Sequence, residues 1–317
     1  MSIRSELIRE LELNRTKPIS GQDLANRLSV SRNAVCKMIH TLNEEGFEIQ
    51  SFPRRGYLMT DTSNRLSSEA ISCYLKEKLP VYTYDLVDST NQLLKKMAID
   101  GSEHLTLIAA EEQSAGRGRF GRPFYSPSRT GVYMSLLLRM PQQLCDASMI
   151  TIYAAVAVHR TLKRLYQIET QIKWVNDILY QGKKLCGILC EAISDFESGR
   201  IEAVIVGIGL NVSTAVFPEE LQDIAVSFAS HGVNRNELIA NIVNELIDLQ
   251  KAERRAVLEQ YREKSLVLHR SITWKQNGKN CSGYVKDIND FGNLVVESDD
   301  TTVVLNSGEV SVREAAV

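Results

Sequence analysis

The chain has 317 residues, of which 44% are hydrophobic and 24% are charged, and its formal net charge at pH 7 is −2. This composition is that of an ordinary globular protein, and the length predicts two or three domains. A net charge so close to zero argues against a protein that coats nucleic acid along its whole length.

The cysteines predict free thiols rather than a disulfide framework or a zinc site. No C-x-x-C pair occurs, and the nearest two, Cys186 and Cys190, lack a third and fourth ligand at zinc spacing. The first residues, MSIRSELIRELELN, are amphipathic and acidic, unlike a signal peptide, and the longest apolar stretch, Met149–Val158, is too short to span a bilayer. We therefore expect a cytoplasmic protein without a membrane segment, with reduced thiols at Cys36, Cys73, Cys145, Cys186, Cys190 and Cys281.

The N-terminal segment predicts a helix-turn-helix. Apolar residues recur at helical spacing from Ile3 to Leu11, from Leu24 to Leu28 and from Val35 to Leu42, with Ser31 placed as the N-cap of the last helix and Gly46 at its end. The stretch FEIQSFPRRGYLMT then predicts a hairpin, or wing, with a basic tip.

Basic and amide side chains on the last helix and the wing favour DNA binding over the alternative, a small helical packing domain with solvated charges. Such donors can reach phosphates and base edges in a major groove. The candidates are Arg32, Asn33, Lys37, Arg54 and Arg55. His40 lies on the same side of the helix.

A polar linker at residues 61–70 leads to a predicted helix at Ser68–Glu77, and strand-like and helix-like runs then alternate to residue 267. The short turns between strands from Ile172 to Gly207 predict hairpins and thus a largely antiparallel sheet. The predicted strands are Leu105–Ala110, Val132–Leu138, Ile172–Trp174, Ile178–Tyr180, Leu185–Glu191 and Ala203–Gly207, and the predicted helices are Met149–Leu165 and Glu237–Gln260.

The last fifty residues predict a small all-β, barrel-like module. Its short strands are separated by turn residues such as Asn277-Gly278 and Asn289-Asp290. The predicted strands are Ser271–Lys275, Cys281–Ile288, Gly292–Glu297 and Thr302–Leu305.

The loop GRGRFG at residues 116–121 has the spacing of a dinucleotide fingerprint but lacks its context. It follows a strand, yet RPFYSPSRTG and another strand come next, so no helix opens there to bind a pyrophosphate. Instead, the glycines permit positive φ and close approach of the backbone to a ligand. Arg117, Arg119 and Arg122 provide clustered guanidinium groups, which favours a nucleotide phosphate or a substrate carboxylate over a solvated basic loop.

Four further segments carry polar residues at the ends of predicted strands: DSTN at 88–91, KWVND at 173–177, KKLCGILCE at 183–191 and GIGLN at 207–211. Each alone is weak, because Asp177 could cap a turn and the lysines could be a solvated hairpin tip. No P-loop, kinase, G-x-S-x-G or H-E-x-x-H motif is present.

Together and in this order, DSTN, GRGRFGR, KWVNDILYQGKKLCGIL and VGIGLN closely resemble the biotin–protein ligases. The helix-turn-helix and the C-terminal β module extend the resemblance to nearly the whole chain, in the layout of the bifunctional class that is both ligase and repressor of biotin-synthesis genes. It implies an α+β multidomain protein: a winged helix-turn-helix at 1–62, a catalytic domain at 63–267 with a mixed, largely antiparallel sheet like that of class II synthetases, and an SH3-like β-barrel at 268–317.

The resemblance implies that biotin attacks the α-phosphate of ATP, giving biotinyl-adenylate, and then passes to a lysine of the biotin carboxyl carrier domain of a carboxylase. It places biotin against Ser89, Thr90, Asn91, Gln113, Arg117, Gly118, Arg119 and Lys184. It places the nucleotide against Arg119, Arg122, Phe124, Lys184 and Asn211, with Mg²⁺ on the phosphates. Lys184 and Arg119 would be the catalytic residues.

Two departures from the family pattern bear on adenine binding. Phe124 stands where many members have Trp, and the segment Val212–Ser227 also lacks a Trp, so less aromatic area is available for stacking. Repression implies an adenylate-bound homodimer on operator DNA. The alternatives are a lipoate–protein ligase, and a regulator that senses biotin or its adenylate without transferring it.

Overall fold

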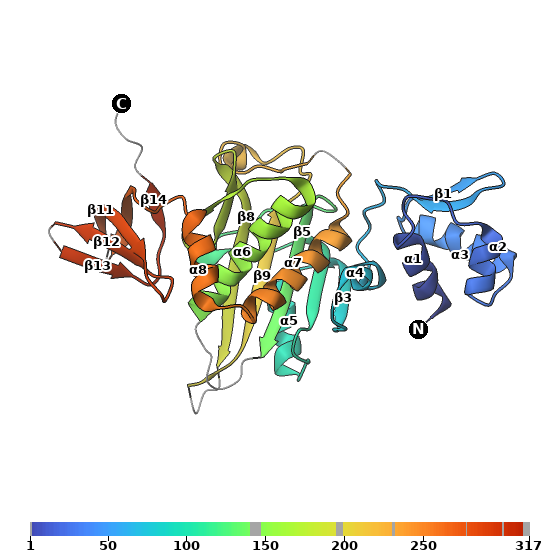
Figure 1. The fold of residues 1–317 in the computed structure, drawn as a ribbon, viewed down its shortest axis with the longest axis horizontal. Helices are drawn as coiled ribbons and strands as arrows, with labels where there is room; N and C mark the ends of the chain where they lie inside the picture. Colours follow the sequence, from blue (N-terminus) through green and yellow to red (C-terminus); the bar gives the residue numbers. More distant parts are fainter. Residues whose placement is uncertain are drawn as a thin grey trace.

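The computed structural model of the chain describes residues 2–139, 147–194, 199–229, 232–276, 278–299 and 301–312. Figure 1 shows three parts in a row: a helical head at the N-terminus, a central sheet covered by helices, and a small C-terminal sheet.

The head is the predicted helix-turn-helix with its wing. Helix α3 begins where expected because the Ser31 hydroxyl accepts a hydrogen bond from the Ala34 N–H at 3.2 Å. The wing strands pair antiparallel, with Phe52 opposite Gly56, so Arg54 and Arg55 lie at the tip. The head elements are α1 Ile3–Glu12, α2 Gly21–Arg27, α3 Arg32–Glu44, β1 Ile49–Phe52 and β2 Gly56–Met59.

Helix α4, Ser68–Tyr74, is shorter than the predicted helix, which extended to Glu77. The side chain of Asn244 binds backbone groups that a longer helix would use. It accepts a hydrogen bond from the Lys76 N–H at 2.9 Å and donates one to the Tyr74 carbonyl at 2.8 Å, so the helix ends at Tyr74. The buried core of the head includes Ala70 of α4, so this helix lies between head and central domain.

The central sheet is largely antiparallel, as predicted. Its strand order is β3-β4-β5-β9-β8-β7-β6, and among the described strands β3 and β4 form the one parallel pair. That pair needs a crossover, which helix α5, Thr90–Ile99, provides. The prediction missed α5. The strands are β3 Val81–Val87, β4 Leu107–Gln113, β5 Gly131–Arg139, β6 Gln171–Lys173, β7 Asp177–Tyr180, β8 Lys183–Ser194 and β9 Ile201–Asn211.

Alternate residues of the central strands face two separate cores. On β5, Leu136 and Leu138 belong to the large core under α6 (Ala147–Tyr166) and α7 (Arg235–Gln250), whereas Leu137 packs with α5 on the opposite face. In Figure 1, α6 and α7 lie side by side across the front of the sheet. Both faces of the sheet are therefore covered.

The predicted helix Glu237–Gln260 is two helices, α7 and α8 (Arg254–Glu263), because the chain is extended at Glu253. The apolar periodicity is interrupted there: no large apolar residue lies between Leu249 and Val257. The break lets α8 bury its own apolar face and carry the chain to the C-terminal sheet.

The C-terminal sheet is antiparallel, in the order β13-β12-β11-β10-β14. Within the described residues β13 and β14 are its two edges, so the predicted closed barrel is not confirmed. Its buried side chains are continuous with the large central core, and the Trp174 indole donates to the Gly292 carbonyl at 2.9 Å. The strands are β10 Ser271–Gln276, β11 Lys279–Ile288, β12 Leu294–Ser298, β13 Thr301–Leu305 and β14 Val310–Val312.

The predicted thiols are confirmed where the structure describes them, and Cys145 lies outside the described residues. In the part of the chain that the structure describes, no helix has the length and apolar character to cross a membrane.

A buried ion pair attaches the linker after the head to the central sheet. The side chain of Arg235 is completely buried and lies 2.6 Å from Glu111 Oε2. The same guanidinium donates to the carbonyls of Gly131, at 3.0 Å, and Asn64, at 2.6 Å, while Glu111 accepts the Leu66 N–H at 2.8 Å. Each charge is thus paired and also hydrogen-bonded to backbone, as buried charges require.

Replacing Arg235 with Met should lower the free energy of unfolding by about 3–5 kcal/mol, because the buried carboxylate of Glu111 would lose its partner at 2.6 Å and keep only Arg65, whose Nη1 lies 3.7 Å from Glu111 Oε1. Urea denaturation followed by circular dichroism measures this. As a control, Lys76→Met removes the exposed pair with Asp248 and should cost less than about 1 kcal/mol. Equal losses in the two variants would contradict this account.

Candidate functional site

The central domain contains a cavity of about 600 Å³. It lies between the glycine- and arginine-rich loop, the start of α5, the first half of β8 and the last residues of β9. Residues 217–225, in the loop after β9, form part of its rim. Every residue that the sequence analysis assigned to a small-molecule site lines this one cavity: Ser89, Thr90, Asn91, Gln113, Arg117, Gly118, Arg119, Arg122, Phe124, Lys184 and Asn211.

The GRGRFG loop opens no α-helix, as predicted. Residues Arg119–Gly121 form a single 3₁₀ turn, and the Gly118 N–H donates to the Arg122 carbonyl at 2.7 Å. The glycines serve different purposes, and the prediction of positive φ is wrong for two of the three. Only Gly121 has positive φ, whereas a Cβ at Gly116 would lie 2.5 Å from the Phe124 carbonyl oxygen.

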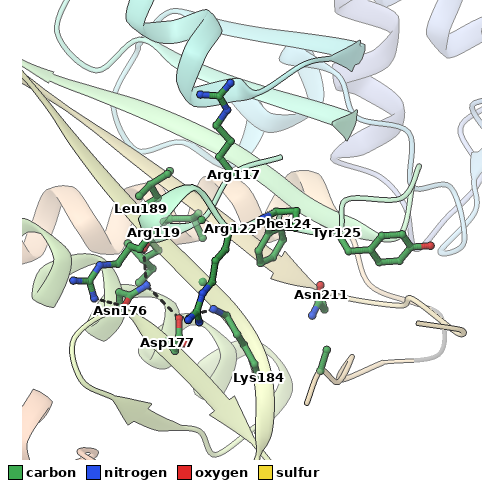
Figure 2. A pocket seen from close by; sticks show the side chains of 18 of the residues that line it. Arg117, Arg119, Arg122, Phe124, Tyr125, Asn176, Asp177, Lys184, Leu189 and Asn211 are labelled. Carbon is green, nitrogen blue, oxygen red and sulfur yellow. Dashed lines mark hydrogen bonds and ion pairs between the residues drawn. The ribbon is translucent and has the colours of Figure 1, made fainter. Parts of the chain in front are cut away.

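The three arginines of the loop do not gather at one point, contrary to the prediction. Arg119 is half-buried and donates to Asn176 Oδ1 at 3.0 Å. Arg122 forms a bidentate ion pair with Glu309 of the C-terminal module, with 2.7 Å between Nη2 and Oε2. Figure 2 shows Arg117 pointing away from Arg119 and Lys184. Each arginine therefore has a different neighbourhood.

A cationic end of the cavity forms around Arg119 and Lys184. Lys184 Nζ lies 2.6 Å from Asp177 Oδ1, and Asn176 links the carboxylate to Arg119 by donating to Asp177 Oδ1 at 3.2 Å (Figure 2). Burial lowers the pKa of the Arg119 guanidinium, while the Asp177 carboxylate opposes that shift. Arginine keeps its charge in proteins, so two cations share one anion here.

The loop after β9 closes the side of the cavity next to Lys184. The Lys184 N–H donates to the Ile224 carbonyl at 2.8 Å, and the Val226 N–H donates to the Lys184 carbonyl at 3.0 Å. In the same loop Phe217 lies near Tyr125, with 6.4 Å between ring centroids. The loop thus brings an aromatic residue to the rim.

The opposite end of the cavity is neutral and polar. Ser89 is the N-cap of α5, and Thr90 and Asn91 in its first turn are buried. Gln113 at the end of β4 accepts from the Thr90 N–H at 2.9 Å and donates to the Ser126 hydroxyl at 2.9 Å. The crossover from β3 to β4 thus places hydroxyl and amide groups at this end.

Glycines make room between the two ends. A Cβ at Gly209 would lie 2.5 Å from the Phe124 ring, and one at Gly187 would lie 3.4 Å from it. Phe124 therefore lies on the backbones of β8 and β9 as part of the cavity wall. Asn211 is buried at the end of β9 and also lines the cavity.

The sequence analysis did not assign two groups of residues around the cavity. Asn176 and Asp177 were noted as a weak candidate segment, and the structure joins them to Arg119 and Lys184. Ser135 lies completely buried behind Thr90 and Asn91. The sequence feature that could have pointed to Ser135 is a lone hydroxyl residue inside the apolar run YMSLLL, since a buried hydroxyl needs a hydrogen-bond partner.

The residues predicted to contact DNA lie on the surface of the head. Arg32, Asn33 and Lys37 are exposed on α3, and Arg54 and Arg55 are exposed at the wing tip. They come from the second helix of the helix-turn-helix and from the wing, the two elements expected to approach a duplex.

Comparison with known families finds three consecutive matches. Residues 4–58 match a helix-turn-helix (HTH) domain, residues 83–211 match the "Biotin/lipoate A/B protein ligase family", and residues 268–313 match the "Biotin protein ligase C terminal domain". The matched segments coincide with the head, with most of the central sheet and with the C-terminal sheet.

Individual relatives are similar over most of the chain. The "Bifunctional ligase/repressor BirA" of Bacillus subtilis (strain 168) is 37% identical, and the alignment covers 76% of each chain. The "Biotin--[acetyl-CoA-carboxylase] ligase" of Mycobacterium tuberculosis is 32% identical over 70% of this chain and 85% of its own. Among solved structures, a biotin protein ligase from Aquifex aeolicus in complex with biotin and ATP has a TM-score of 0.64 at 26% identity, covering 75% of this chain and all of that one.

Gly207→Ala should disturb the neutral end of the cavity, because the added Cβ would overlap with Asn91 Oδ1. We expect a loss of about 1–3 kcal/mol in the free energy of unfolding, measured by urea denaturation. The control is Gly118→Ala, whose Cβ would meet only the Arg122 carbonyl at 3.6 Å and should cost no more than about 0.5 kcal/mol. If both variants were equally stable, the packing of Asn91 against Gly207 would be irrelevant to the fold.

Proposed function

Because the chain belongs to the biotin protein ligase family, within its bifunctional ligase/repressor branch, we propose that it activates biotin with ATP, transfers biotin to an acceptor lysine, and represses biotin-synthesis genes. The observation that supports the proposed ligase activity is the cavity, which has a cationic end at Arg119 and Lys184 and a neutral polar end at Thr90 and Gln113. Biotin has the matching pair of ends, a carboxylate and a cyclic urea.

Biotin would lie along the cavity with its urea against Ser89, Thr90, Asn91 and Gln113. Its carboxylate would reach Arg119 and Lys184, where guanidinium and ammonium donors form charge-assisted hydrogen bonds. Arg117 and Gly118 would come over the ligand from the loop, which requires Arg117 to turn inward from its exposed position.

In the first step a biotin carboxylate oxygen forms a bond to the α-phosphorus of ATP, and the bond to pyrophosphate breaks. Two anions must meet for this. Lys184 would stand between carboxylate and α-phosphate, offsetting their repulsion and the charge that grows at the phosphate. The ion pair with Asp177 holds the ammonium at the cavity until the substrates compete for it.

ATP would enter beside biotin, on the side of Arg122, Phe124 and Asn211. Arg122 would exchange Glu309 for phosphate oxygens, since a carboxylate and a phosphate each offer two oxygens that its guanidinium fork can bind together. Phe124 can stack on adenine, and Tyr125 and Phe217 supply further aromatic surface nearby. Mg²⁺ would accompany ATP as part of the substrate, because it prefers phosphate and water oxygens.

In the second step the lysine amine of a biotin carboxyl carrier domain attacks the acyl carbon of the adenylate, and AMP leaves with the bonding electrons. The mixed anhydride must be kept from water until then. Closure of residues 116–122 and of the loop after β9 over the cavity would exclude water.

Lys184→Ala and Arg119→Ala should each reduce biotinylation at least about 100-fold, because each removes a cation from the point where two anions meet. Transfer of labelled biotin to a purified biotin domain measures this and also tests the function itself. Lys96→Ala, an exposed lysine on α5, is the matched control. Full activity in either site variant would refute its assigned role.

Pyrophosphate exchange, and biotin binding compared with biotin transfer, distinguish two other functions. The central family match includes lipoate ligases, but the C-terminal match and the relatives named above favour biotin. Pyrophosphate exchange that depends on lipoate and not on biotin would establish the lipoate alternative. Biotin binding without any transfer would establish a sensor that only regulates transcription.

Repression would use the head on a two-fold operator, with a homodimer that forms when the adenylate is bound. One surface for dimerisation is the edge of β8. The strand pairs with β7 only as far as Gly187, so among the described residues no strand covers that side of Leu189–Ser194. A two-fold copy could extend the sheet there.

Neutralising Arg32 and Lys37 should weaken operator binding and reduce its salt dependence, with the slope falling by about 0.9 for each phosphate that the protein no longer neutralises. Fluorescence anisotropy with labelled operator DNA across a salt series measures both quantities. The control is Lys95→Ala with Lys96→Ala, an equal change of charge on α5. A DNA surface elsewhere on the molecule would be indicated if only the control variant lost affinity.

We further propose domain boundaries at 1–62, 63–267 and 268–317. We expect the C-terminal unit to be an SH3-like barrel, since its five strands already pair in an antiparallel series. The site of action would be the cytoplasm, where ATP and the acceptor carboxylase are found.

A further inference from the structure

A carboxylate that does not line the cavity is hydrogen-bonded to its neutral end. Glu191 on β8 accepts a hydrogen bond from Asn91 Nδ2, at 2.7 Å to Oε2. Asn91 lies in the first turn of α5, where the partial positive charge of the helix end favours an anion nearby. Asn91 lines the cavity and Glu191 does not, so Glu191 can affect a ligand only through Asn91.

Glu191 determines which way the Asn91 amide faces. An ionised carboxylate only accepts hydrogen bonds, so it must meet the NH₂ group. The second partner agrees, because Nδ2 also donates to the Leu189 carbonyl at 3.2 Å. Both amide protons are then used, and Oδ1 faces the Ser135 hydroxyl at 2.6 Å.

The orientation of the Asn91 amide also determines the hydrogen bonds of its neighbours Ser135, Thr90 and Gln113, which with Asn91 form the wall of the neutral end. Ser135 has one proton, and it points toward Asn91 Oδ1 and Thr90 Oγ1, the latter at 2.8 Å. The Thr90 hydroxyl donates to Gln113 Oε1 at 3.1 Å. The protons of Asn91, Ser135 and Thr90 are therefore all used within the wall, and the wall offers a ligand only oxygen lone pairs at these positions.

We propose that Glu191 is a positioning residue that makes the Thr90 and Asn91 side of the neutral end a hydrogen-bond acceptor, selective for ligands that present N–H groups there. This proposal rests on the function proposed above, in which the group recognised is the cyclic urea of biotin. Each ring nitrogen of that urea carries a proton. A ligand with an acceptor atom in place of an N–H would face lone pairs on both sides, and an unpaired buried polar group is costly.

The kinetics of two variants test this. Glu191→Leu removes the acceptor and should raise the KM for biotin about tenfold, with the KM for ATP unchanged. Glu191→Gln keeps an acceptor oxygen but loses the charge, and charge-assisted bonds are about twice as strong as neutral ones, so it should give a smaller rise of about threefold. Glu202→Leu, an exposed glutamate on β9, is the control.

A second measurement separates positioning from a merely structural role. Calorimetry compares the affinity for biotin with that for an analogue in which a ring N–H is replaced by oxygen. The wild-type protein should prefer biotin strongly, and the preference should shrink in the order wild type, Glu191→Gln, Glu191→Leu. Should the Leu variant not fold, the Gln variant alone still makes this comparison.

The proposal is overturned if both variants keep the wild-type KM for biotin, if KM for biotin and ATP rise together, or if the preference for biotin over the analogue is unchanged. If the proposed biotin ligase function itself were wrong, the result would be different, because the wild-type protein would then not bind biotin in the calorimeter. Binding by wild type with no effect of either variant refutes only the role of Glu191.

Discussion

Holding two cations next to each other in a partly buried cavity is the constraint on which the site depends. Arg119 and Lys184 come from segments more than sixty residues apart, and their repulsion would push them toward solvent if nothing opposed it. Asp177 opposes it directly at Lys184 and through Asn176 at Arg119. In the function we propose, substrate anions would compete with this carboxylate for the two cations.

The neutral end depends on the connection between β3 and β4. These strands pair in parallel, so the chain must cross over between them, and α5 is that crossover. Its first turn delivers Thr90 and Asn91 to the end of the sheet where β4 ends at Gln113. Ser135 and Glu191 support this turn from β5 and β8. The specificity we propose for the urea group thus comes from packing between four elements of the central domain.

The head and the cavity are connected through buried polar contacts. Arg235 binds both the linker carbonyl of Asn64 and the carbonyl of Gly131, at the start of β5. Beside Gly131, the Thr130 carbonyl accepts the N–H groups of Val212 and Ser213, where the loop after β9 begins. On the other side of the linker, Glu12 of α1 accepts from the Tyr74 hydroxyl at 2.9 Å and from Asn234 at 2.7 Å. The side chains of Arg235 and Glu12, which make these contacts, are both buried.

The sequence by itself determined the order of the three parts, the helix-turn-helix with its wing, the largely antiparallel sheet, and every residue assigned to the cavity. The three parts and their elements follow from local periodicity and turn residues, which depend on near neighbours in the chain. The cavity residues came from the resemblance of four short motifs to the biotin–protein ligases. The local pattern was misleading at α4, whereas at the break before α8 the apolar periodicity is interrupted and the predicted single helix overlooked it. Helix α4 ends early because Asn244, 170 residues from Tyr74 in the sequence, binds the Tyr74 carbonyl and the Lys76 N–H.

Only the tertiary structure decided how the assigned residues are oriented and what supports them. The three loop arginines, adjacent in sequence, have different partners because Asn176, Glu309 and open solvent lie in different directions from the loop. The Arg235–Glu111 pair and the Asn91–Glu191 contact join residues far apart in the chain, and the pairing of β10 with β14 decides which strands are the edges of the C-terminal sheet. A sequence pattern records which side chains a chain has, whereas the partner of a buried charge or amide is set by packing of distant segments against each other.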